Sequence, residues 1–176
     1  MLAEALIDPS KILRVPEFQD ALHCIDEFER RFPQIKVTVF LGELPEGVDV
    51  NGAAVWLLNQ GVVTRQNQIH PAEWTLAVII TPACSQASIG VGYALEHLLP
   101  GAVVSSVLGS VRHHLWHREY GRAVRGILDG CQKHLLSHGT SRPRQLTQTS
   151  VSGANHLGLR PLGTQDQQEP EKTISF

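Results

Sequence analysis

The segment HHLWH at residues 113–117 is the most conspicuous group of side chains able to bind a metal. His113 and His117 are four residues apart, so on a helix they would share one face, as zinc-binding histidines do. A zinc-protease motif has a glutamate where this chain has His114, so the general base of that mechanism is missing. Trp116 indicates that this segment packs against the domain rather than opening around a metal. We therefore interpret these histidines as surface residues among arginines.

Glu96 is a second candidate, because it follows the apolar segment 89–95. Open α/β sheets bind their ligands beyond the carboxyl ends of strands, so a carboxylate there can serve a ligand site. The alternative is a solvated carboxylate near a helix N-terminus, which the helix dipole favours. The residues alone leave both interpretations open.

Two glycines, Gly90 and Gly92, precede Tyr93 in a strand-end loop. A Gly-x-Gly pair can cradle a phosphate, but a dinucleotide fingerprint needs a third glycine and a P-loop needs a Gly-Lys-Ser/Thr step. Both are missing here. Close packing of the backbone at the strand end is the favoured explanation.

The three cysteines, Cys24, Cys84 and Cys131, lie far apart without a CxxC pair. This spacing fits neither a disulfide framework nor structural zinc, so we expect buried free thiols. Cys84 lies in a turn whose neighbours include no base that would activate it as a nucleophile. We expect it to be buried or inert.

Hydrophobic periodicity indicates the elements that position these residues. It predicts a helix between Pro16 and Pro33, a strand over 35–41, a helix capped by Asn51 and closed by Gly61, strands over 75–81 and 84–91, and helices after Tyr93. Strand-helix-strand units followed by a hairpin predict an α/β fold, a small mixed β-sheet sandwiched by helices.

Composition sets the extent of the folded part. The chain has 176 residues, 42% of them hydrophobic, with 15 Lys+Arg against 17 Asp+Glu. A net charge of -2 gives no reason to expect a nucleic acid or an anionic membrane as partner. All tryptophans, tyrosines and cysteines precede His138, and the segment that follows is polar and rich in Ser, Thr and Gln. We predict a domain over residues 8–138 and a disordered polar C-terminal tail over 139–176.

Targeting signals are sparse. The first ten residues, MLAEALIDPS, lack a basic segment and an uninterrupted apolar run, so they do not read as a signal peptide. The longest uncharged segment, Trp74 to Leu95, is long enough for a membrane span, but it contains Pro82, Gly90 and Gly92 and fits two strands and a turn better. The default expectation is a cytoplasmic protein without a membrane span; a truncated N-terminus would make it extracytoplasmic.

The order of several motifs resembles the TPM domain family, named for a thylakoid-lumen phosphatase-like protein, a photosystem II repair factor and a receptor-associated membrane protein. The segment IGVGYALE at 89–96 is similar to the family's strand-to-helix signature. LPGA at 99–102 is similar to its Leu-Pro-Asp-Ala step, and LWHREY at 115–120 to its aromatic-x-x-Asp-Tyr segment. Upstream, VTV at 37–39 and LPEG at 44–47 resemble its first strand and following loop.

This resemblance implies a Rossmann-like αβα sandwich. It also implies phosphatase-like activity, divalent-metal binding or assistance to a membrane complex, with acidic residues as the metal or phosphate positions. The chain departs from the pattern at Gly101, where the family has Asp, and in the lead-in to the strand at 75–81. Glu96 remains, and Glu73 can supply a second carboxylate. Ca²⁺ or Mg²⁺ prefers several oxygen ligands, so the site resembles a degenerate one.

Two functions therefore stay open. The first is a non-catalytic or degenerate TPM-like module that binds a protein or membrane-complex partner through basic C-terminal helices. The second is a weak phosphatase that acts on phosphomonoesters with Ca²⁺ or Mg²⁺ held by Glu73 and Glu96. The incomplete set of carboxylates favours the first. No catalytic residue is assigned.

Overall fold

The structure is a computed structural model that describes residues 5–59, 62–63 and 69–140. Its elements are, in chain order, β1 (Leu6–Ile7), α1 (Val15–Arg31), β2 (Lys36–Leu41), α2 (Val50–Asn59), β3 (Val62–Val63), β4 (Ile69–His70), η1 (Ala72–Trp74), β5 (Thr75–Thr81), β6 (Gln86–Val91), η2 (Tyr93–Leu95), α3 (Gly101–Trp116) and α4 (Tyr120–Thr140). The two η elements are single turns of 3₁₀ helix.

The main sheet has the strand order β1-β2-β5-β6. Strands β1, β2 and β5 are parallel, whereas β6 pairs with β5 in antiparallel fashion, with Leu76 opposite Val91 and Thr81 opposite Gln86. Every residue of β5 is buried, as expected for a central strand covered on both faces. β3 and β4 form a separate antiparallel pair. The predicted mixed sheet is confirmed.

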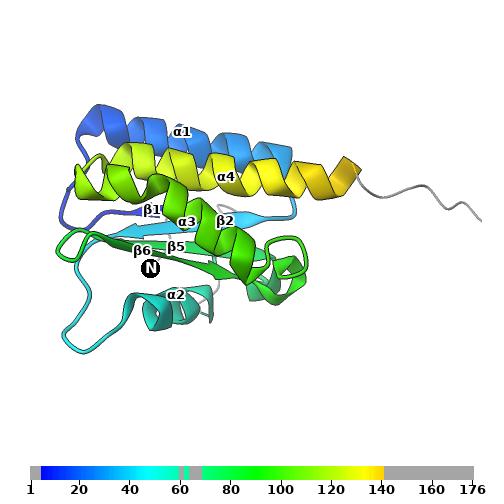
Figure 1. Ribbon diagram of the computed structural model, residues 1–176, viewed down its shortest axis with the longest axis horizontal. Helices are drawn as coiled ribbons and strands as arrows, with labels where there is room; N and C mark the ends of the chain where they lie inside the picture. The colour runs from blue at the N-terminus through cyan, green and yellow to red at the C-terminus, as the bar shows by residue number, and fades with distance from the viewer. Residues whose placement is uncertain (1–4, 60–61, 64–68, 141–176) are drawn as a thin grey trace, which may run out of the picture. The chain divides into compact units, whose positions relative to one another are not determined.

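Helices cover both faces of this sheet. Figure 1 shows α1 and α4 side by side on one face with α3, and α2 on the opposite face. Side chains of β5 alternate accordingly, because Val78 and Ile80 join the larger core beneath α1, α3 and α4, while Ile79 packs with Ala54 of α2. The predicted α/β sandwich is therefore confirmed.

The N-terminal end of α2 differs from the prediction. Oδ1 of Asp49 accepts hydrogen bonds of 2.9 Å from the backbone N–H groups of Asn51 and Gly52, so Asp49 caps the helix. Asn51 lies inside the first turn, and its Oδ1 accepts a 2.8 Å hydrogen bond from the Ser88 hydroxyl. The predicted cap at Asn51 is wrong because the chain enters the helix two residues earlier. The predicted closure at Gly61 lies outside the described residues.

The first strand, β1, is not predicted from hydrophobic periodicity, because its two residues are too few to show a repeat. Leu6 is fully buried and pairs with Val39, so β1 belongs to the sheet although it precedes residue 8, the predicted start of the domain. At the other end α4 reaches Thr140, and the remainder of the predicted tail, from 141 on, lies outside the described residues.

The uncharged segment from Trp74 to Leu95 contains β5, the hairpin turn, β6 and η2. The two strands and the turn agree with the prediction. Among the residues that the structure describes, no helix combines the length and the apolarity needed to cross a bilayer.

Candidate functional site

The sequence-predicted residues gather where β5 begins and β6 ends, which we call the amino end of the sheet. Gly92 donates a 2.9 Å hydrogen bond to the carbonyl of Thr75, and a Cβ atom on Gly92 would lie 2.4 Å from the carbonyl oxygens of Ala72 and Glu73. A Cβ atom on Gly90 would lie 2.9 Å from the carbonyl oxygen of Ala54. Both glycines are thus needed for close backbone packing, which confirms the favoured explanation.

Glu73 and Glu96 belong to the turns η1 and the end of η2, which this packing brings together. Both side chains are exposed, and within the described ranges neither has a hydrogen bond or an ion pair. Tyr93 is also exposed, at 81%. Because β6 is antiparallel, its carboxyl end lies where the parallel strands begin. The strand-end rule that made Glu96 a candidate therefore does not apply to it.

The residues at the amino end do not fit a Ca²⁺ or Mg²⁺ site. Within residues 5–59, 62–63 and 69–140, no three His, Cys, Asp or Glu side chains lie together so that they could hold a metal ion. Gly101 begins α3, and a Cβ atom there would have open space within 4 Å. Two exposed carboxylates do not supply the oxygen-rich shell that these cations require.

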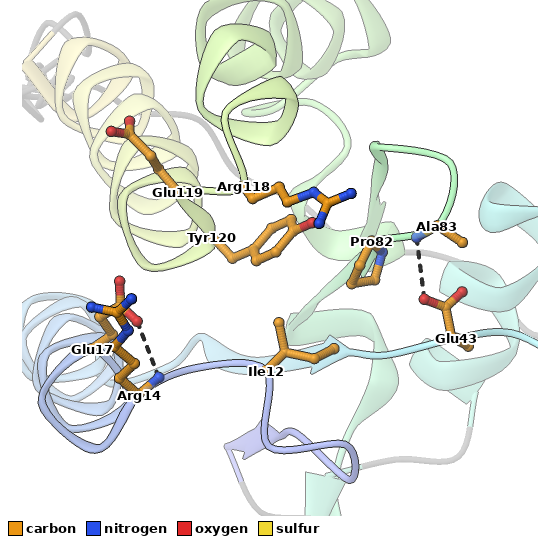
Figure 2. A pocket seen from close by; sticks show the side chains of 9 residues that line it. All are labelled: Ile12, Arg14, Glu17, Glu43, Pro82, Ala83, Arg118, Glu119 and Tyr120. Atoms are coloured by element: carbon orange, nitrogen blue, oxygen red, sulfur yellow. Dashed lines mark hydrogen bonds between the residues drawn. The ribbon is translucent and has the colours of Figure 1, made fainter.

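The opposite end of the sheet, where β1, β2 and β5 end, is built differently, and we call it the carboxyl end. Four turns converge there on an open pocket of about 570 Å³ (Figure 2). Its lining comes from the β1–α1 loop and the start of α1, the β2–α2 loop, the β5–β6 turn and the α3–α4 turn: Ile12, Arg14, Glu17, Glu43, Pro82, Ala83, Arg118, Glu119 and Tyr120. This is the end at which open α/β sheets bind ligands.

The carboxylates of these loops are engaged in structural hydrogen bonds. Asp8 accepts two of 2.9 Å from the N–H groups of Ile12 and Leu13, and so folds the β1–α1 loop around itself. Glu17 accepts one of 3.0 Å from the N–H of Arg14. Glu43 accepts one of 3.1 Å from the N–H of Ala83 and ties the β2–α2 loop to the β5–β6 turn.

Glu119 is held by two side chains. Its carboxylate accepts a 2.7 Å hydrogen bond from Nδ1 of His114 and a 2.8 Å hydrogen bond from Nη1 of Arg122. The hydrogen bond from His114, followed by that from Arg122, lowers the pKa of Glu119. His114, one of the three histidines in the conspicuous segment, therefore helps to hold Glu119 in place.

Arg118 stands apart from these engaged groups. Its side chain is exposed and has no hydrogen-bond or ion-pair partner within the described part of the chain. Figure 2 shows its side chain extending toward Pro82, the side to which the hydroxyl of Tyr120 also points, and both residues line the pocket. The Tyr120 ring is 6% exposed and is held in the core. Arg14 lies at the far end of the pocket, next to Glu17 (Figure 2).

The backbone of this end is strained at three positions. Lys11, Ser85 and Arg118 have φ values of 50°, 48° and 59°, and they are the residues other than glycine with positive φ in the described ranges. Each lies in a turn at the carboxyl end. Arg118 follows the last turn of α3, where a left-handed residue ends many helices and glycine is the usual choice. Such conformations cluster at functional sites.

A second cavity, of about 480 Å³, adjoins the start of α2, the start of β6 and α3. Arg112 lines it, and the guanidinium carbon of Arg112 lies 5.3 Å from the centre of the exposed Trp116 ring. This geometry is a cation–π contact. It explains why Trp116, which the sequence assigns to packing, contributes to the surface instead.

The cysteines are free. Burial raises the pKa of Cys131 to about 12, and burial also raises the pKa of the half-buried Cys24. Cys84 is exposed, so the expectation of burial is wrong for this residue. The reason is that Cys84 lies in the β5–β6 turn, beyond Thr81 and Gln86, which form the last pair of the two strands.

Sequence reasoning missed the pocket. Arg118 and Tyr120 come from one turn, but the signal that marks a left-handed helix end is glycine, and the chain has arginine there. The converging loops also lie far apart in sequence. Only the fold brings Glu43, Ala83 and Arg118 to one place.

Comparison with known proteins identifies the fold. The chain is similar to three domains solved by solution NMR: the N-terminal domain of the cg2496 protein of Corynebacterium glutamicum (14% identity over 90% of this chain and 93% of that one, TM-score 0.57), the N-terminal domain of a P. gingivalis protein (13%, 80% and 85%, 0.57) and the BA42 protein of the psychrophilic bacterium Bizionia argentinensis (12%, 76% and 86%, 0.54). At such identities the likeness concerns the fold alone. No protein-family model matches the chain, and no curated protein matches it in sequence.

Proposed function

We propose that the chain is a TPM-like, non-catalytic module that binds a protein partner, free or within a membrane complex, through an acidic surface of that partner. Two observations support this function: the motif order that resembles the TPM family, and an α/β sandwich with helices on both faces of its sheet. A third, the chemistry of the carboxyl end, carries the proposal.

At the carboxyl end the carboxylates are engaged, while a cation is left without a partner. Asp8, Glu17, Glu43 and Glu119 each accept a hydrogen bond within the domain. General acid–base chemistry needs a carboxylate that can exchange a proton with the substrate, and these groups already hold the loops in place. Arg118 has no such task, and its guanidinium points into the pocket. This arrangement favours binding of an anionic group over catalysis.

The neighbouring helices extend the positive charge. We define the basic surface as the exposed side chains of Arg112, Arg118, Arg122, Arg125 and Lys133 on α3, the α3–α4 turn and α4. Between residues 112 and 137 the acidic residues are Glu119, which is bound to Arg122, and Asp129. This segment therefore has more basic than acidic residues, whereas the whole chain carries -2. Such complementarity accelerates association and selects acidic partners.

The alternative, a weak phosphatase with Ca²⁺ or Mg²⁺ at Glu73 and Glu96, has less support. The two carboxylates are exposed, at the amino end of the sheet. Neither carboxylate lines either of the two pockets described above.

The test uses a polyglutamate peptide as a generic acidic probe, with the fluorescence of the exposed Trp116 as readout. We expect saturable binding that weakens with salt. The double variant Arg125→Glu, Lys133→Glu should lose about tenfold in affinity and show a smaller salt dependence. The matched control, Arg30→Glu with Arg31→Glu at the end of α1, should stay within about twofold of the wild type.

Two results would overturn this function. One is the failure of polyglutamate to bind the wild type at low salt. The other is turnover of a generic phosphomonoester that needs Mg²⁺ or Ca²⁺ and disappears in Glu96→Ala, because it would establish the enzyme instead.

A further inference from the structure

We propose that the pocket at the carboxyl end is a carboxylate-binding site, in which Arg118 receives an acidic side chain of the partner and Tyr120 donates a hydrogen bond to it. This inference rests on the proposed function and names the point at which the partner is recognised.

The geometry supplies two donors that face one space. Arg118 and Tyr120 line the same pocket, and Figure 2 shows the guanidinium of Arg118 and the hydroxyl of Tyr120 both directed toward the side on which Pro82 lies. Within the described ranges neither has a hydrogen-bond partner. Guanidinium groups bind carboxylates through two parallel hydrogen bonds, and a buried tyrosine ring keeps its hydroxyl in a fixed position.

The backbone of Arg118 supports a binding role. With φ of 59°, this residue occupies the left-handed region, which an L-residue with a Cβ atom adopts at a cost and glycine adopts freely. Two hydrogen bonds fix the turn: Arg118 N–H to the carbonyl of Leu115 at 3.1 Å, and Glu119 N–H to that of His114 at 2.8 Å. The domain therefore maintains an unfavourable conformation at the residue whose side chain enters the pocket.

The charges around the pocket select a monoanion over a phosphate dianion. Glu17, Glu43 and Glu119 line the same space as Arg14 and Arg118. A phosphate would bring two negative charges close to three carboxylates and a single inward-pointing guanidinium. A carboxylate carries one charge and matches one guanidinium. A volume of about 570 Å³ and an open mouth leave room for the peptide that bears it.

The carboxylate of Glu43 can also bind the main chain of such a peptide. Glu43 uses Oε1 to accept the hydrogen bond from Ala83, and its other oxygen remains available to a backbone N–H of the ligand. The site thus combines a charged donor for the acidic side chain with acceptors for the main chain, which favours a peptide over an isolated small acid.

The experiment compares two capped hexapeptides by isothermal titration, Gly-Glu-Glu-Glu-Glu-Gly and the same peptide with Gln at each Glu position, with sodium phosphate as a third probe. The wild type should bind the Glu peptide at least about tenfold more tightly than the Gln peptide or phosphate. Arg118→Gly should weaken that binding about tenfold, and Arg118→Lys should weaken it less, because lysine keeps the charge without the fork.

Protein stability separates lost binding from lost folding. Arg118→Gly should raise the melting temperature by about 3 °C, because it relieves the left-handed backbone. The control Arg31→Gln, at the end of α1 and outside the pocket lining, should bind the Glu peptide within about twofold of the wild type.

Each other outcome is decisive. If Arg118→Gly binds the Glu peptide unchanged while the double variant Arg125→Glu, Lys133→Glu loses binding, the pocket proposal is overturned and the proposed module stands. Equal binding of the Gln peptide or tighter binding of phosphate would overturn the carboxylate assignment. Failure of the Glu peptide to bind the wild type, while polyglutamate binds, would also overturn the pocket; failure of both would overturn the module as well.

Discussion

The two ends of the sheet use their residues in opposite ways. At the amino end the conspicuous motif, Gly90 and Gly92, lies against neighbouring backbone, and the carboxylates nearby have no partners in the described structure. At the carboxyl end the carboxylates are bound by N–H groups and by His114 and Arg122, while the guanidinium of Arg118 has no partner among the described residues.

This difference shows that a motif that is easy to recognise in the sequence need not take part in function. Glycines at a strand end are easy to notice, and here they are required by packing. Three residues with unfavourable φ, spread over the chain, are invisible to pattern reading, and all of them lie in turns at the carboxyl end. Close backbone packing constrains the glycines of the amino end, whereas the residues with unfavourable φ lie at the carboxyl end.

The largest effect should come from filling the packed end. Gly92→Ala places a Cβ atom 2.4 Å from two carbonyl oxygens, so the backbone must move, and we expect a loss of about 3 kcal/mol in the free energy of unfolding. Urea denaturation measures it. Gly101→Ala, whose Cβ would meet open space, is the control and should be neutral or slightly stabilising. Equal stability of both variants would contradict the packing role of Gly92.

The next largest effect should be a gain in the free energy of unfolding, obtained by relieving the strained backbone. Arg118→Gly removes the penalty of a left-handed residue and should stabilise the domain by about 1 kcal/mol in the same denaturation experiment. Ser85→Gly, in the β5–β6 turn, should behave alike. A loss of stability in both variants would show that their side chains serve the fold and would remove the contrast between the two ends.

Introducing the aspartate of the resembling TPM pattern tests whether the amino end can hold a metal ion. Gly101→Asp adds a carboxylate in the first turn of α3, where the helix dipole favours it, and should stabilise the domain by about 0.5 kcal/mol. Addition of Ca²⁺ or Mg²⁺ should leave its melting temperature unchanged. A saturable upward shift with either ion would instead show that Glu73, Glu96 and the new aspartate form a metal site.

The smallest effect concerns pH at the carboxyl end. Hydrogen bonds from His114 and Arg122 lower the pKa of Glu119 from its ordinary value of 4.5. The stabilisation is complete well above pH 4.5 and is lost as the pH falls through the lowered pKa, because protonation ends both interactions. Glu119→Gln should therefore flatten the decline of stability below pH 4.5 in acid denaturation, and Glu96→Gln should leave the curve of the wild type. Parallel curves for Glu119→Gln and wild type would contradict this role.

Much of the fold follows from local sequence. The continuous apolar segment from Thr75 to Thr81 predicts the buried central strand, and the helical spacing after Pro16 predicts α1. These signals are strong because each element buries a whole face. The two residues of β1 carry no periodicity, and the cap of α2 shifts from Asn51 to Asp49 because cap residues are interchangeable in type.

The candidate site could be predicted less well. The sequence predicts a hairpin, and a hairpin reverses β6, so Glu96 after β6 lies where the parallel strands begin. The pocket at the other end joins residues from four separate turns, and its key residue, Arg118, adopts a conformation for which arginine has no preference. Neither long-range convergence nor a disfavoured φ leaves a local pattern.

The central claim is that ligands meet this domain at the carboxyl end of its sheet. The direct measurement is a titration of the full chain with the capped Glu hexapeptide, followed through the backbone amide resonances. The account predicts saturable shifts centred on Ala83 and on residues 118–120, with residues 73 and 92–96 unmoved. Shifts centred on 73 and 92–96 instead would contradict it.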